Sequence, residues 1–227
     1  MDHIILDDIK FKVNVEHLFK RIHIDPKSED AELIMSLVTK AEEIGKPKVL
    51  YKLSYIDSKE EDHVVVDGVK LTSRVLRVNF AEIHRVFPYV ATCGRELHDW
   101  ANTLEDILEK YWVDTIMEMA LGVAIEAFHT HLEEKYHLGK ISAMNPGSLE
   151  DWPIGQQEEL FNLLGNVEDY IGVELTDSYL MMPIKSTSGI LFPTDTNFES
   201  CQLCPRENCP GRRAKYEEHL YEEKYGR

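Results

Sequence analysis

Apolar residues recur at helical spacing in two consecutive segments near the start of the chain. The first segment covers residues 15–24 and ends at Asp25-Pro26, since proline interrupts a helix. The second covers about residues 29–44 and ends at Gly45, a residue type that often follows the last turn of a helix. The two stripes predict a helical hairpin over about residues 14–45.

The pattern then changes to the two-residue period of β-strands. Residues 48–56 alternate well enough for one strand, and residues 64–69 contain Asp67-Gly68, a dipeptide typical of two-residue hairpin turns. Residues 86–92 form an apolar run that predicts a buried strand. Cys93 is therefore expected at a turn between a strand and a helix.

The second half of the chain begins with two predicted long helices, over residues 95–110 and 112–137. After a loop rich in Pro and Gly, the pattern predicts one helix and two short strands, at residues 156–164, 173–175 and 188–192. From residue 194 the composition becomes polar and charged. We therefore divide the chain into a domain over residues 1–193 and a Cys-rich tail over residues 194–227 that ends in a short surface helix.

The composition restricts the possible partners. A chain of 227 residues with 43% hydrophobic content is long enough for one full core, and its apolar runs are far shorter than the roughly 20 residues of a membrane-spanning helix. A formal net charge of −16 disfavours binding to nucleic acid or to anionic lipid. The sequence starts Met1-Asp2-His3 without the pattern of a secretion signal, so we expect a cytoplasmic protein.

The four cysteines are unevenly distributed. Cys201, Cys204 and Cys209 lie within nine residues of each other, and Cys93 lies far upstream. In a reducing compartment, a Cys-x-x-Cys pair indicates a metal or redox site more than a disulfide. With Cys93 as fourth ligand, both a [4Fe–4S] cluster and tetrahedral zinc are chemically allowed. The alternative is a set of free thiols that pack as small apolar side chains.

Three stretches carry a resemblance to a known family: Glu126-Ala127-Phe128, Asn145-Pro146-Gly147 with Asp151-Trp152-Pro153, and Leu175-Thr176-Asp177-Ser178 followed by residues 182–189. In order and spacing, residues from about 90 to 192 resemble the activation domain of vitamin B12-dependent methionine synthase. The nearest versions are free-standing proteins of anaerobes with a cysteine-rich C-terminal tail. The resemblance implies an α+β fold, a twisted antiparallel sheet flanked by helices. It also implies a shallow S-adenosylmethionine groove used to remethylate oxidised cobalamin.

The resemblance implies the cofactor-binding residues, whereas catalytic residues stay unassigned. Glu126 matches a helix glutamate that holds the ligand, and Asn145, Pro146 and Gly147 match a ligand-binding turn. Ser186 and Ser188 offer hydroxyls to the ligand or to the partner, or satisfy the backbone of a bent strand instead.

The sequence departs from the family beside that turn. The family's arginine, which pairs with the ligand carboxylate, is replaced by Ala143, and its tyrosine is replaced by Ser148. Loss of the arginine removes a charge-assisted pair from the expected S-adenosylmethionine site.

Two functions follow as alternatives. The first is an accessory protein that docks on a corrinoid-binding protein or methyltransferase, whose cobalamin it reactivates. It would present S-adenosylmethionine or pass on an electron, and the electron favours iron–sulfur over zinc because zinc has no redox chemistry. The second is a non-enzymatic module that binds a corrinoid protein or a metal and has lost the S-adenosylmethionine site.

Overall fold

Strand β6 (Arg85–Thr92) is the centre of the sheet, because its residues from Val86 onward are buried on both faces. The computed structural model describes residues 3–195, 198–209 and 211–226. Strands β2 (Lys48–Tyr51) and β3 (Ser54–Lys59) pair with β6 on one side, and β10 (Ser186–Pro193) pairs with it on the other. We predicted one strand over residues 48–56. These residues belong to two strands, β2 and the start of β3, and both pair with β6.

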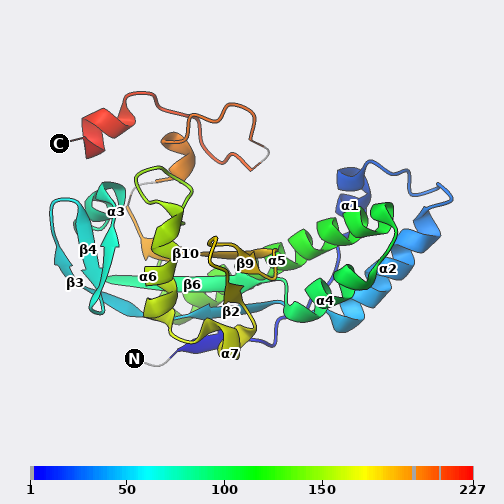
Figure 1. Cartoon of the computed structure of the whole chain (residues 1–227). Coiled ribbons are helices and arrows are strands. Elements are labelled where there is room, and N and C mark those ends of the chain that lie inside the picture. The colour runs from blue at the N-terminus through cyan, green and yellow to red at the C-terminus, as the bar shows by residue number, and fades with distance from the viewer. Residues whose placement is uncertain (1–2, 196–197, 210, 227) are drawn as a thin grey trace.

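The remaining strands extend the curled sheet outward (Figure 1). They are β1 (Ile4–Leu6) beside β2, β4 (His63–Val66) and β5 (Val69–Thr72) beyond β3, and β7 (Ile141–Met144) beside β10. All of these pairs are antiparallel, so the expected α+β fold with an antiparallel sheet is confirmed. A separate small ribbon pairs β8 (Glu174–Leu175) with β9 (Met181–Met182).

The predicted Asp-Gly hairpin joins β4 to β5. Asp67 and Gly68 have φ values of 43° and 81°, the left-handed conformation that a two-residue turn of this kind requires.

A helical lobe extends from one end of the sheet, as Figure 1 shows. It contains α1 (Val15–Ile22), α2 (Ala31–Ile44), α4 (Arg95–Thr103) and the first half of α5 (Ile107–Tyr136). The first two match the predicted hairpin. The predicted boundary at residues 110–112 is wrong, because Asp106 accepts hydrogen bonds from the amides of Leu108 and Glu109 and starts α5 earlier. Among the helices in the described ranges, none combines the length and apolar character needed to cross a membrane.

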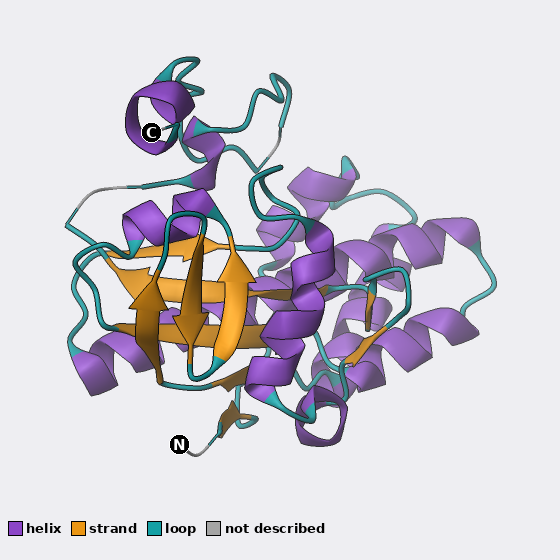
Figure 2. Cartoon of the chain, turned by 60° about the vertical axis from the view of Figure 1, so that its left-hand side comes forward, coloured by secondary structure: helices purple, strands orange, loops and turns teal. Residues whose placement is uncertain are grey.

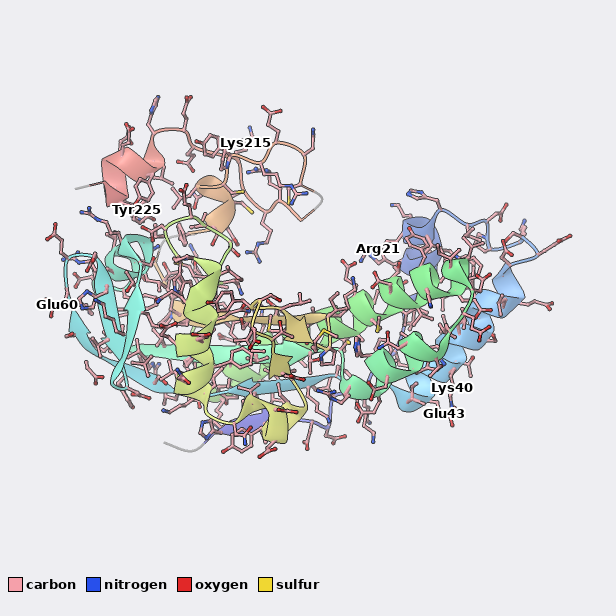
Figure 3. All side chains as sticks on the ribbon, in the orientation of Figure 1. Arg21, Lys40, Glu43, Glu60, Lys215 and Tyr225 are labelled. Carbon is pink, nitrogen blue, oxygen red and sulfur yellow. The ribbon has the colours of Figure 1, made fainter. Side chains whose placement is uncertain are left out.

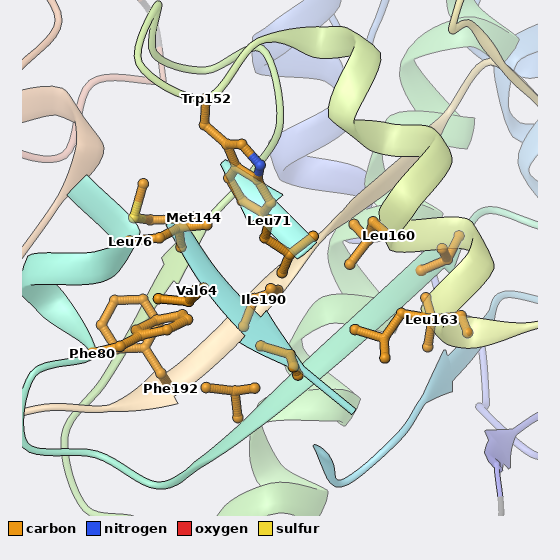
Figure 4. Close-up of a cluster of buried hydrophobic side chains, with 14 of the residues drawn as sticks. Val64, Leu71, Leu76, Phe80, Met144, Trp152, Leu160, Leu163, Ile190 and Phe192 are labelled. Atoms are coloured by element: carbon orange, nitrogen blue, oxygen red, sulfur yellow. The ribbon is translucent and has the colours of Figure 1, made fainter. Parts of the chain in front are cut away.

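The second half of α5 covers one face of the sheet, where Phe128 packs between the rings of Tyr51 and Tyr89. The opposite face is covered by α3 (Arg74–Asn79), α6 (Gln157–Leu164), α7 (Val167–Ile171) and the loop around Trp152, as the view in Figure 2 shows. Figure 4 shows the core on this face, which includes Val64, Leu71, Phe80, Met144, Trp152, Leu160, Ile190 and Phe192.

The Cys-rich tail packs on this second face. Phe198 and Tyr225 are buried members of the same apolar cluster, and Leu203 and Cys204 lie against it. The hydroxyl of Ser142 donates to the carbonyl of Phe198 at 2.8 Å, which ties the tail to β7. The expected surface helix at the end corresponds to a single turn at Tyr221–Tyr225 (Figure 3), whose last ring is fully buried.

Tyr225→Ala is expected to lower the free energy of unfolding by about 3 kcal/mol, because it removes a fully buried ring from the main core. Urea unfolding followed by circular dichroism measures the change. Tyr216, on the same tail but 44% exposed, is the matched control, and its alanine variant should stay within about 0.5 kcal/mol of the wild type. Equal unfolding midpoints for all three proteins would contradict the packing of the tail.

Candidate functional site

The side-chain amide of Asn145, in the turn after β7, joins three strands. Its Nδ2 donates to the Ser188 carbonyl of β10 at 2.7 Å and to the Tyr89 hydroxyl of β6 at 3.2 Å. Gly189 makes this approach possible, since a Cβ there would lie 2.5 Å from the Asn145 Nδ2 and from the Met144 carbonyl. The close approach of Asn145 and Met144 to β10 therefore explains the glycine of the Ser-x-Ser-Gly stretch.

The turn itself is closed by its own backbone. Gly147 has a φ of 81°, and its N–H donates to the carbonyl of Trp152 at 2.7 Å, while the N–H of Ser148 donates to the carbonyl of Asn145 at 3.1 Å. Pro146 is buried beside them. The backbone N–H groups of Gly147 and Ser148 are thus used within the turn.

The two serines of β10 already have protein partners. The Ser188 side chain is buried, and its Oγ accepts a hydrogen bond from Gln157 Nε2 at 2.9 Å. Ser186, which is half-buried, donates to the carbonyl of Pro183 at 2.7 Å and lies 2.9 Å from the Thr92 hydroxyl. These contacts fit the alternative of hydroxyls that support a bent strand, and a ligand contact for either serine stays a prediction.

Glu126 lies on the exposed side of α5, away from the Asn145 amide cluster. It lines a cavity of about 430 Å³ between α5 and the N-terminal segment, together with Asp8, Lys10, His131 and Glu134. His129 follows it by three residues and is therefore its neighbour on the helix surface. The structure brings Asn145, Ser188 and Tyr89 together, whereas Glu126 lines a separate cavity beside the N-terminal segment.

Arg213 of the tail adds a positive charge to this region. Its Nε forms an ion pair with Glu199 at 3.0 Å. Burial raises the pKa of the Tyr89 hydroxyl, and the Asn145 hydrogen bond and the Arg213 charge act in the opposite direction. Burial and the Arg213 charge both lower the pKa of His129.

The four cysteines do not form one cluster. Cys93 is fully buried in the core of the helical lobe, and burial raises the pKa of its thiol to about 12. Cys201, Cys204 and Cys209 are half-buried in the tail, on the side of the other core. In the ranges that the structure describes, no group of three or more His, Cys, Asp or Glu side chains is placed to hold a metal ion.

The loop that carries the tail cysteines is held by arginine. The Arg212 guanidinium donates to the carbonyls of Cys201, Cys204 and Ala214 at 3.0 Å each. The N–H of Arg213 donates a hydrogen bond to the Cys201 sulfur at 3.4 Å. The donor types suit a thiolate-ligated centre, but their arrangement would have to change to bind one.

Comparison with solved structures gives a fold relative. The MetH reactivation domain bound to AdoHcy superposes with a TM-score of 0.63 over 88% of this chain and 81% of that chain, at 15% sequence identity. At that identity the likeness shows the fold alone. No family model and no curated protein matched the sequence.

Sequence reasoning missed Tyr89, Gln157 and Arg213. Tyr89 belongs to an apolar strand pattern, in which its hydroxyl gives no separate signal. Gln157 stands in a short helix, and Arg213 comes to the sheet only through the folding of the tail. The sequence does show that Glu126 and His129 lie three residues apart on one predicted helix. This spacing makes the two side chains neighbours on the helix surface.

Iodoacetamide applied to chelator-treated native protein is expected to alkylate the three tail cysteines and to spare Cys93. Iodoacetamide reacts with the thiolate form of cysteine. The Cys93 thiol is buried, and its pKa is raised to about 12, so little thiolate is accessible to the reagent. Peptide mass spectrometry over time measures each site, and unfolding in urea should expose Cys93 as a positive control. Alkylation of Cys93 as fast as Cys209 in the native state would contradict its placement.

Proposed function

We propose that this chain binds S-adenosylmethionine or its demethylated product and acts as a reactivation protein for a corrinoid partner. The observation that carries the proposal is the fold likeness to a reactivation domain bound to AdoHcy over 88% of the chain. The local support is the Asn145 amide, which fixes the turn after β7 against β10 and β6. The candidate ligand-binding residues lie in this turn, on β10 and on α5.

The ligand would lie over the surface between the turn and α5. Glu126 is exposed and carries the negative charge that a methionyl ammonium group needs as a partner. Asn145, Pro146 and Gly147 would supply shape and a rigid edge, because their polar groups are engaged within the protein. S-adenosylmethionine supplies an electrophilic methyl group when bound, and this chain's residues would orient it.

The partner in this proposal is a corrinoid-binding protein or methyltransferase that carries the cobalamin. An adenosyl ligand held on an open surface suits transfer of its methyl group to a cofactor on another molecule. The proposal is therefore for an accessory protein in a B12-dependent methyl-transfer system.

A second function is favoured by two substitutions. Ala143 packs against the apolar cluster under α5, and Ser148 is engaged through its N–H in the turn, so neither replaces the family's arginine and tyrosine at its own position. A chain that has lost ligand binding would still dock on a corrinoid protein as an interaction module.

Calorimetric titration with AdoHcy distinguishes the two functions. The first predicts micromolar binding to the wild type and an affinity about tenfold lower for Glu126→Ala, through loss of one charged contact. Glu134→Ala is the matched control, because Glu134 lies on the same helix and lines the same cavity. Absence of heat at millimolar ligand, with corrinoid protein still bound in a pull-down, would favour the interaction module.

The tail cysteines belong to a separate part of the proposal. A centre that passes an electron to the partner would be ligated by Cys201, Cys204 and Cys209, with Cys93 as the fourth ligand only if the tail or the helical lobe rearranges. The half-buried thiols and the amide that faces the Cys201 sulfur support thiolate ligation.

Metal analysis of anaerobically purified protein tests this centre. We expect iron and sulfide in the wild type and loss of both in Cys201→Ser, because a Cys-x-x-Cys pair needs both thiolates. Cys93→Ser decides the fourth ligand, since a three-cysteine tail site would keep its iron in that variant. Stoichiometric zinc without iron would exclude the iron–sulfur assignment, and metal-free protein would leave four free thiols.

A further inference from the structure

We propose that a cavity between the C-terminal tail and the rest of the domain binds a small organic cation, an ammonium group on a flat apolar skeleton. The cavity lies on the side of the sheet that α3 covers, whereas Glu126 belongs to α5, which covers the opposite face. The inference is therefore independent of the proposed function.

The cavity is formed where the tail folds back over the domain. Figure 1 shows the tail, in orange to red, over α3 and the loop that precedes α6. The cavity has a volume of about 420 Å³, within the range of about 300–1,000 Å³ that is usual for small-molecule sites. Its walls come from the domain at Val75, Leu149, Glu150 and Asp151, and from the tail at Leu203, Pro205, Tyr216 and Tyr221. A ligand in this cavity would contact both sides of the junction.

The Asp151 carboxylate is held in a fixed position at this junction. Its Oδ2 accepts hydrogen bonds from the Ser73 hydroxyl and, at 3.0 Å, from the N–H of Val75, at the start of α3. Its Oδ1 accepts a hydrogen bond from the Tyr221 hydroxyl of the tail at 3.1 Å. The carboxylate and one aromatic wall are therefore positioned before any ligand arrives, which lowers the entropic cost of binding.

The lining of the cavity is negatively charged. Glu150 and Asp151 contribute carboxylates, and none of the described residues that line the cavity is Lys, Arg or His. Burial raises the pKa of the Tyr221 hydroxyl, the charges of Asp151 and Glu150 raise it further, and the charge of Arg74 lowers it. Two negative charges and one positive charge thus act on this hydroxyl, so the excess charge at the cavity is negative.

The remaining walls are aromatic and apolar. Tyr216 and Tyr221 are 44% and 38% exposed, and a tyrosine ring attracts an ammonium group placed over its face. Leu149, Leu203 and Pro205 offer apolar surface to a flat skeleton. A metal ion would lack ligands here, because no third His, Cys, Asp or Glu in the described ranges joins the two carboxylates. An organic cation is the ligand class that matches both the charge and the walls.

The test uses tryptamine, a primary ammonium on an indole ring, and tryptophol, in which a hydroxyl replaces the ammonium group. We expect the whole chain to bind tryptamine at least about tenfold more tightly than tryptophol, the effect of one charge-assisted contact. Nuclear magnetic resonance of methyl-labelled protein measures both affinities. It also locates the site, because methyl signals of Leu149 and Leu203 should move and that of Leu37, buried in the helical lobe, should stay in place.

Two variants change the lining without removing a buried side chain. Glu150→Gln removes an exposed carboxylate, and Tyr216→Ala removes a ring that is 44% exposed. Each is expected to weaken tryptamine binding by about threefold to tenfold. Glu218→Gln removes an exposed tail carboxylate outside the lining and should change the affinity by less than about twofold. Urea midpoints equal to that of the wild type show that the variants keep the fold.

Three results would overturn the inference. The first is that the Leu149 and Leu203 signals stay unchanged at millimolar tryptamine. The second is equal affinity for tryptamine and tryptophol, which would remove the role of the charge. The third is tryptamine binding that both lining variants leave unchanged, because the amine would then lie elsewhere. None of these results changes the expected AdoHcy titration, so the inference and the proposed function fail or stand separately.

Discussion

The hydrogen bonds of one amide, that of Asn145, determine how the edge of the sheet is built. The amide spans from the turn after β7 to the Ser188 carbonyl and the Tyr89 hydroxyl, so it fixes the edge strand against the two strands inside it. Leaving a buried partner without its hydrogen bond costs about 1–3 kcal/mol, which makes the contact hard to replace. The close approach of the amide to β10 also requires a residue without a side chain, Gly189, opposite the amide. The spacing of the Asn-Pro-Gly and Ser-x-Ser-Gly stretches therefore records a structural requirement.

The polar groups of the candidate site therefore fall into two sets, those that are hydrogen-bonded within the protein and those that are exposed. The turn and β10 use most of their polar groups internally, as the Gly147 amide and the Ser188 hydroxyl do. They form a rigid support. Charged side chains that are exposed lie outside this support, as Glu126 does on α5 and the ion pair of Arg213 with Glu199 does on the tail. A rigid support with charged groups at its rim is the arrangement that a shallow binding surface needs, because orientation comes from fixed geometry and affinity from a few charged contacts.

How much of this the sequence could predict depends on the range of the interactions. The Asp67-Gly68 hairpin and the two N-terminal helices are determined by local preferences, and the sequence pattern located them. Strand β7 has only four residues and exists because β10 pairs with it, so its own pattern carries no strand signal. The start of α5 depends on the Asp106 cap, which the apolar period alone does not reveal. Burial of Tyr225 against α3 joins residues that lie far apart in the sequence, and no local pattern predicts it.

The same reasoning applies to the charges of the site. A carboxylate is bound by a guanidinium at a position in space, and the segment that carries the guanidinium is free to vary as long as it reaches that position. The tail is anchored to β7 at Ser142, so Arg213 comes from a distant part of the sequence to the edge of the sheet, where it pairs with the Glu199 carboxylate. A tail packed as core, through Phe198 and Tyr225, holds its side chains in place at a lower entropic cost than a solvated tail would. The packing that buries Phe198 and Tyr225 therefore also holds the charged side chains of the tail in place.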